Sequence, residues 1–384
     1  MTASALTRPG ERDRLVVKIG QIDWLLVALI CAIAGIGATM LYSIAGSSWS
    51  PWAAEHLLRV GICVAIMLVL AVVDLRVWSF LAYPVYVVGL LLLVAVELVG
   101  ETRLGAQRWL DLGVVTLQPS EIMKIGIVLA LARYYHSISA AEAKWSWKLI
   151  VPTLLIIVPV GLVMHQPDLG TGMLILMTGA AVMFMAGLSL KVVGILAGLG
   201  AAAIVPIITF VLHDYQRERI FTFLNPEADP SGGGYQIVQS KIALGSGGLF
   251  GRGYGLGSQS RLDFLPEKQT DFIFATLAEE FGFIGSLSVL ILYCLVIFIC
   301  LRIATIAHSH FGRLAAAGVT ATFAFYVMIN GAMVMGLAPV VGVPMPLLSY
   351  GGTVLLTVMI GFGLVQAVRV HRYSEITSGK GTLI

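Results

Sequence analysis

The chain has 384 residues, of which 58% are hydrophobic and only 12% are charged, and its formal net charge is +3. Its mean hydropathy is +0.92, whereas soluble domains carry about 25% charged residues, so a soluble globular protein is excluded. In a bilayer only helices and closed barrels span the hydrocarbon core. The apolar runs are continuous and about 20 residues long, as in a spanning helix, and do not alternate like barrel strands. The composition therefore predicts an all-α polytopic membrane protein.

About ten apolar segments are predicted to be spanning helices. Their expected bounds are Trp24–Ile44, Val60–Val73 (extending back through His56), Trp78–Val99, Pro119–Tyr135, Leu149–Met164, Gly170–Gly187, Val192–Leu212, Phe272–Leu301, Leu314–Gly336 and Gly352–Val368.

An even number of spans places both ends of the chain on one side of the membrane. Basic residues gather in the N-terminal tail 1–22, in the C-terminal tail 369–384 and in alternate short loops, and the positive-inside rule makes that side cytoplasmic. We therefore expect a single membrane domain over residues 1–384, with both termini cytoplasmic. The long loop between the seventh and eighth spans, residues 213–270, is then extracytoplasmic.

The first unusual outer segment reads GAQRWLDLGVVTLQPSEIMK and runs into the fourth predicted span. Glu121 and Lys124 are three residues apart, so they share a helix face. They are either a first-turn acid with a snorkelling lysine or a functional pair, and we favour the pair because ionisable groups inside a membrane are costly. Arg108, beside Trp109, is equally consistent with an interfacial anchor and with a bidentate phosphate ligand.

Two more outer segments carry polar groups next to helix ends. HQPDLGTG places Gln166 and Asp168 at a turn, where Asp168 is either a helix N-cap or part of a site. DYQRERI places Arg217 and Arg219 after the seventh span, where cations suit a helix C-terminus and would also meet a head group or a pyrophosphate. The glycine-rich stretch that follows is either a flexible linker or a functional loop, and its length favours the loop.

The stretch FLPEKQTDFIF places Glu267, Lys268 and Asp271 just before the eighth span. Asp271 is either a helix-start acid with a low pKa or a general base whose pKa is raised by desolvation, and its position leaves both open. Glu279 and Glu280 follow two turns deeper, roughly 12–14 Å along the axis. We expect Glu267 and Lys268 to be rim groups.

The stretch APVVGVPMPLLSYGG interrupts two apolar spans with prolines and glycines and contains Ser349 and Tyr350. Irregular backbone at membrane depth is tolerated where it lines a cavity, so we expect a re-entrant wall. The sequence has no Walker loop, zinc signature or nucleophile elbow. All four cysteines lie in apolar runs and are expected to be buried small hydrophobes. The residues alone do not decide between two functional classes, an enzyme and a transporter.

Five of these segments together resemble the SEDS family (shape, elongation, division and sporulation), and specifically its RodA-type members. The resemblance covers Trp24 to about Arg372. It rests on GAQRWLDLG…LQPSEIMK, QPDLGTG, FLNPEADPSGGGYQIVQSKIALGSGGLFGRG, FLPEKQTDFIFATLAEEFGFIG and PMPLLSYGG. Gln269 departs from the histidine that many relatives have at this position.

The resemblance implies a peptidoglycan glycosyltransferase that polymerises lipid II at the outer face of the bacterial cytoplasmic membrane. Asp271 would be the general base for the 4-hydroxyl of the acceptor sugar, with inversion at the donor carbon and loss of undecaprenyl pyrophosphate. The resemblance also matches Glu121, Lys124, Trp109 and Glu267 to family motif positions.

The implied partners are lipid II, a class B penicillin-binding protein and the elongation proteins MreB, MreC and MreD, in addition to the bilayer. No nucleic acid, nucleotide, haem or flavin is expected. A divalent cation, Mg²⁺ or Mn²⁺, would suit the leaving pyrophosphate, but the sequence identifies no ligands for it. The competing functions are a lipid II flippase and a non-catalytic scaffold for the transpeptidase. Clustering of the charged groups towards one membrane face and the lack of a clear internal repeat weigh against the flippase.

Overall fold

The computed structural model describes residues 15–103, 106–111, 116–144, 146–211, 214–226, 229 and 232–376. Its helices are α1 (Leu15–Gly20), α2 (Trp24–Ile44), α3 (Trp52–Ala71), α4 (Leu75–Val99), α5 (Pro119–Ser137), α6 (Ala140–Lys144), α7 (Ile150–His165), α8 (Leu169–Met185), α9 (Leu190–Pro206), α10 (Asp214–Leu224), α11 (Gly233–Ser246), α12 (Ser258–Arg261), α13 (Ile273–Ile306), α14 (His310–Val334) and α15 (Gly352–Val370). A 3₁₀ turn, Trp147–Leu149, precedes α7, and a π turn, Ile207–Val211, follows α9.

All ten predicted spans are helices in the described residues. Eight helices of the described part of the chain are long and apolar enough to cross a membrane. The other two are α8, which has 17 residues, and α5, which carries Glu121 and Lys124. The second span begins at Trp52 and includes His56, as expected. The all-α polytopic class is therefore confirmed.

A small antiparallel sheet in the first outer loop is the departure from a purely helical chain. Its strands are β1 (Glu101–Arg103), β2 (Ala106–Asp111) and β3 (Thr116–Leu117), in the order β1-β2-β3. The sheet lies between α4 and α5 in the chain and precedes the N-terminus of α5. It therefore fixes where Arg108 and Trp109 stand.

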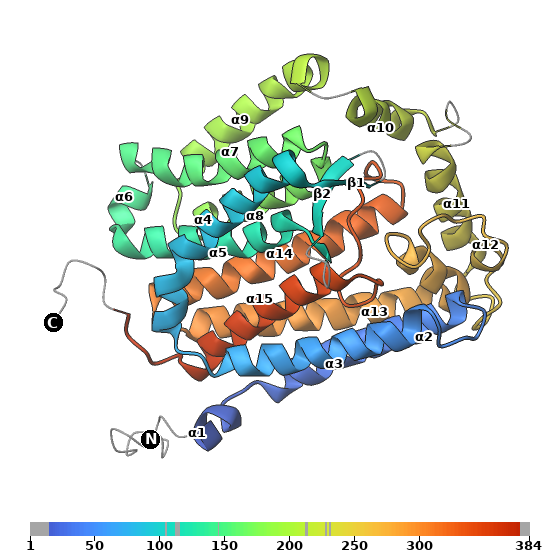
Figure 1. The fold of residues 1–384 in the computed structure, drawn as a ribbon, viewed down its shortest axis with the longest axis horizontal. Coiled ribbons are helices and arrows are strands. Elements are labelled where there is room, and N and C mark those ends of the chain that lie inside the picture. Colours follow the sequence, from blue (N-terminus) through green and yellow to red (C-terminus); the bar gives the residue numbers. More distant parts are fainter. Residues whose placement is uncertain are drawn as a thin grey trace.

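The centre of the bundle is formed by α14 and α15, and 67% of the apolar window of each is buried, against 28% for α3. These two helices run beside α5 and α13 in Figure 1. Cys63 and Cys300 are buried in this packing, but Cys31 and Cys294 are exposed. The prediction that all four cysteines are buried was therefore wrong for two, which lie on outward faces where a thiol is as acceptable as a small apolar group.

The long segment between α9 and α13 contains the helices α10, α11 and α12, and its glycine-rich part is packed against α13. Gly282 has a φ of +66°, which breaks the helix there. Such a break leaves backbone groups unpaired. The glycine-rich loop satisfies them: Phe283 N donates to Gly248 O at 2.9 Å, and Arg252 N donates to Glu279 O at 3.0 Å. The loop is thus an ordered part of the bundle and does not act as a flexible linker.

Candidate active site

Arg108 joins the first outer loop to the turn before α8. Its Nε donates to Gln166 O at 3.3 Å and lies 3.9 Å from Asp168 Oδ2. Its Nη2 also donates to Pro167 O. The side chain is half-buried, so Arg108 organises the turn as well as carrying charge there. Trp109 stands beside it on β2 and is half-buried.

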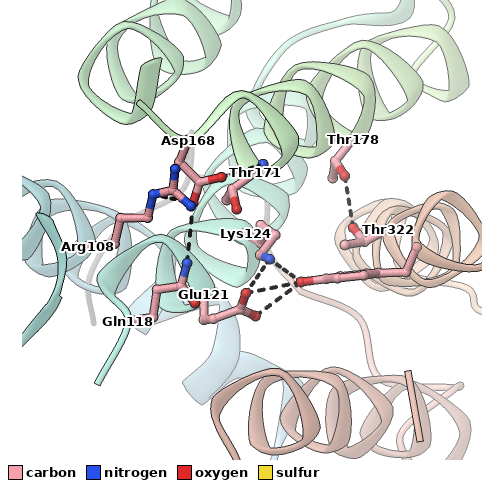
Figure 2. A network of polar contacts seen from close by, with 9 residues as sticks. Arg108, Gln118, Glu121, Lys124, Asp168, Thr171, Thr178 and Thr322 are labelled. Atoms are coloured by element: carbon pink, nitrogen blue, oxygen red, sulfur yellow. Dashed lines mark hydrogen bonds and ion pairs between the residues drawn. The ribbon is translucent and has the colours of Figure 1, made fainter. Parts of the chain in front are cut away.

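Asp168 is the N-cap of α8, because its Oδ1 accepts a hydrogen bond from Thr171 N at 3.2 Å. Its second oxygen accepts from Gln118 Nε2 at 3.3 Å. Figure 2 shows Arg108, Gln118, Asp168 and Thr171 gathered close together. Gln166 is buried and donates to Leu93 O at 2.8 Å. These residues therefore form one polar cluster that ties three outer segments together.

Glu121 and Lys124 form the predicted pair, and both side chains are buried. Lys124 Nζ lies 2.6 Å from Glu121 Oε1, and their exposed fractions are 2% and 3%. Tyr326 completes the pair: its hydroxyl donates to both Glu121 oxygens at 3.2 Å and contacts Lys124 Nζ. Figure 2 shows the lysine and the glutamate pointing toward one another. A cavity of about 30 Å³ beside Lys124 and Tyr326 has room for about one water.

Asp271 precedes α13 and does not cap it. The N-cap of α13 is Phe272, and no side chain caps this end. The Asp271 carboxyl is half-buried and makes no hydrogen bond or ion pair with the described residues. Its backbone oxygen accepts from Asn330 Nδ2 at 2.8 Å. Asp271 therefore does not act as a hydrogen-bonded N-cap of α13, and its carboxyl is available to accept a proton.

Ser349 and Tyr350 hold the residues just before Asp271. Ser349 Oγ donates to Thr270 O at 2.5 Å, and Tyr350 N donates to Gln269 O at 2.9 Å. The Tyr350 hydroxyl donates to Glu55 at the start of α3. The irregular segment before α15 thus fixes the backbone of the two residues that precede Asp271. That it lines a cavity at membrane depth stays a prediction.

Burial raises the pKa of Asp271 to about 7, the nearby Glu267 carboxylate also raises it, and the Arg219 guanidinium opposes both. Glu267 is exposed, and its Oε2 accepts from Thr270 Oγ1 at 3.0 Å. Arg219 donates to Val340 O at 2.8 Å. A Cβ placed on Gly342 would lie 3.7 Å from Asp271 Oδ2, so the loop that Arg219 binds runs beside the carboxyl.

Other predicted residues lie elsewhere. Arg217 Nε and Nη2 donate to Ile208 O and Thr209 O at 3.0 and 2.9 Å, so this side chain closes the end of the preceding helix. The prediction that Lys268 is a rim group was wrong, since it is buried and its Nζ donates to Asp263 Oδ1 at 2.6 Å.

Glu279 and Glu280, the two glutamates further along α13, hold neighbouring segments of the same chain. Glu279 accepts from Ser258 Oγ at 3.0 Å and from Gln259 N at 3.1 Å. Glu280 accepts from Ser43 Oγ at 2.5 Å. Glu279 therefore anchors α12, and Glu280 anchors α2, to the first turns of α13.

Sequence reasoning missed three residues of this region, namely Arg219 as the cation that acts on Asp271, Tyr326 and Asn330. Asn330 was detectable as an amide inside an apolar span, where a polar side chain needs an interhelical partner. Tyr326 carried no comparable signal. Within the described residues, no cluster of three or more His, Cys, Asp or Glu could hold a metal ion.

The fold and these contacts define a polytopic helical membrane protein with a polar site at one end of the bundle, centred on an unpaired aspartate. Residues 21–374 match the model of a cell cycle protein family, FtsW/RodA/SpoVE. The chain belongs to this family, and the predicted resemblance is confirmed.

Relatives and solved structures support the same assignment. Peptidoglycan glycosyltransferase MrdB of Escherichia coli K12 is 44% identical, covering 92% of this chain and 94% of MrdB. Stage V sporulation protein E of Bacillus subtilis is 37% identical, covering 92% and 98%. The Thermus thermophilus rod shape determining protein RodA superposes with a TM-score of 0.67 at 31% identity, covering 92% and 98%. A chain of a peptidoglycan synthase complex that coordinates polymerization and crosslinking superposes with a TM-score of 0.77 at 35% identity, covering 92% and 98%.

Proposed function

We propose that this chain is a peptidoglycan glycosyltransferase that polymerises lipid II at the extracytoplasmic face of the cytoplasmic membrane. The names of its relatives support the class of reaction. The charge bias of the loops supports the orientation, with both termini cytoplasmic and Asp271 at the outer face.

Asp271 is the general base of the proposed reaction. It takes the proton of the acceptor's 4-hydroxyl as that oxygen attacks the anomeric carbon of the donor. The new glycosidic bond forms as the bond to the pyrophosphate oxygen breaks, and undecaprenyl pyrophosphate leaves with the electron pair. Since the donor linkage is α and the product linkage is β, a single displacement inverts the configuration at the anomeric carbon.

A single observation carries this proposal: the Asp271 carboxyl has no hydrogen-bond or ion-pair partner among the described residues, while the backbone around it is held at three successive carbonyls. A general base works best when its pKa lies near the operating pH, and burial raises the pKa of Asp271 to about 7. An aspartate used only to cap a helix would accept backbone hydrogen bonds, which would lower its pKa.

The leaving pyrophosphate requires positive charge near Asp271. Arg219 stands in this position, and its electrostatic field reaches both Asp271 and Asp168. Arg108 adds a second guanidinium at the Asp168 end. A divalent cation would be held mainly by substrate phosphates with one or two carboxylates, as is usual for Mg²⁺, and no step of the proposal depends on it.

We further propose that the chain works with a class B penicillin-binding protein, which crosslinks the strand, and with the elongation proteins MreB, MreC and MreD. The structural likeness to a chain of a complex that coordinates polymerization and crosslinking supports the crosslinking partner. The elongation proteins are proposed from the resemblance to RodA-type members alone.

The test is polymerisation of lipid II by the purified chain with its transpeptidase partner. Asp271→Asn and Asp271→Ala should lower the rate by about 10²–10⁴-fold, the usual contribution of a general base, while leaving membrane insertion intact. Glu218→Gln is the matched control, because Glu218 is an exposed acid in the same outer segment. Glycan synthesis by Asp271→Asn at the wild-type rate would remove Asp271 from the mechanism. Transport of lipid II into liposomes without polymerisation would favour the flippase.

A further inference from the structure

An open hollow of about 690 Å³ lies at the far end of α13 from Asp271. It is formed where α13 ends, α14 begins and α15 passes into the C-terminal segment. This is the end of the bundle predicted to face the cytoplasm, and it lies on the same side as α1 in Figure 1. Its polar lining comes mainly from Arg302, His308, Arg313, Arg369, Arg372 and Tyr373.

The four guanidinium groups of this hollow have little internal compensation. Arg302 and Arg313 are exposed, and neither guanidinium donates a hydrogen bond to a described residue. Arg369 Nε is buried without a hydrogen bond and lies 4.0 Å from the Asp23 carboxylate. Arg372 stacks on Tyr373, with its guanidinium carbon 4.7 Å from the ring centroid, and its Nη1 donates only a long hydrogen bond, 3.5 Å, to Arg369 O. The hollow therefore concentrates positive charge that described protein groups leave largely unneutralised.

The positive-inside bias alone would scatter arginines along this face and would not require a shared cavity. Arg369 in the last turn of α15 also suits the helix dipole. Arg313 does not, because α14 begins at His310 and a cation near a helix N-terminus is disfavoured. An anion in the hollow would meet both the guanidiniums and the N-terminus of α14, and would resolve this conflict.

We propose that the hollow binds a phosphate-bearing anion, namely the phosphodiester head group of an acidic phospholipid or a soluble phosphate ester. Guanidinium groups match phosphate oxygens in a bidentate way. Basic pockets between spanning helices on the cytoplasmic side are suited to acidic head groups. The site is separate from the proposed polymerase site and does not depend on it.

The test uses the purified full-length chain in neutral detergent, with bound ligand counted by native mass spectrometry. The probes are phosphatidylglycerol, phosphatidylcholine and glycerol 3-phosphate. Wild-type protein should retain phosphatidylglycerol over phosphatidylcholine if the lipid is the ligand. Arg302→Ala with Arg313→Ala should weaken phosphatidylglycerol binding about 25-fold, since each arginine near an anionic head group contributes about a factor of five.

The matched control is Lys144→Ala with Lys191→Ala, which removes the same charge from exposed positions outside the hollow. It should leave the affinity unchanged within about twofold, on the scale of the fivefold effect expected per contacting arginine. Competition by glycerol 3-phosphate would identify the soluble ester as the ligand, and its failure to compete would identify the lipid. Either result supports the phosphate site. Absence of binding by both anionic probes, or equal weakening by the two double variants, would overturn it.

Discussion

The pH dependence of polymerisation should report the ionisation of Asp271. A pKa of about 7 leaves about nine tenths of the carboxyl deprotonated at pH 8 and about one tenth at pH 6. If the deprotonated form is the base, kcat/KM for lipid II, which reports ionisation of the substrate-free enzyme, falls about tenfold from pH 8 to pH 6. An aspartate with an ordinary pKa near 3.8 would stay ionised throughout and give no such fall.

Glu267→Gln tests the direction in which the pKa of Asp271 moves when a neighbouring negative charge is removed. The Glu267 carboxylate raises the pKa of Asp271, so replacing Glu267 by a neutral amide should lower that pKa. The acid limb, which is the fall in activity at low pH, should then move to lower pH. The introduced amide keeps an oxygen that can accept from Thr270 Oγ1, so the local contact survives. Glu218→Gln is the control, because Glu218 is also exposed in the outer segment. A limb that stays in place, or moves to higher pH, would refute the electrostatic reasoning.

Three further outcomes follow from the contacts. Glu121→Gln or Lys124→Met alone should impair activity and destabilise the protein by about 3–5 kcal/mol, because each leaves a buried charge unpaired. The double variant should regain thermal stability. If it also regained activity, the pair would be only structural. Asn330→Leu should lower kcat about a hundredfold by releasing the Asp271 backbone, with little change in KM. Thr178→Val, which removes a partly buried hydrogen bond between α8 and α14, should leave kcat unchanged. Gly282→Ala should reduce the yield of monodisperse protein, because a Cβ at φ +66° would lie 2.3 Å from Gly251 N; a normal yield and melting temperature would contradict the role of this break.

Local rules were sufficient to place the helices in the sequence. In lipid every backbone group must be satisfied within its own element, so a long apolar run has few alternatives to a helix. The prediction for Trp24–Ile44 matches α2 at both ends. The error is larger at α3, which begins at Trp52, because Glu55, His56 and Arg59 lower the hydropathy of its first turns. Glu55 and Arg59 pair with one another there, and His56 is buried.

Site contacts between distant segments were not predictable in the same way. Glu121 and Lys124 were paired correctly because their spacing alone puts them on one helix face. Tyr326 joins them from a position more than 200 residues away, and Asn330 reaches Asp271 across 59 residues. Such partners are chosen by how α14 packs against α5 and α13, which no short-range pattern specifies.

The three contacts on successive carbonyls explain why an unpaired carboxyl can be held in place before α13. Tyr350 N, Ser349 Oγ and Asn330 Nδ2 bind the carbonyls of Gln269, Thr270 and Asp271 in turn. Because position is set through the backbone, the side chain needs no hydrogen bond of its own, and its pKa is left to burial and to the charges of Glu267 and Arg219. Orientation and acidity are thus controlled by different residues, so Asn330 variants should change the rate without moving the acid limb, and Glu267 variants should move the limb.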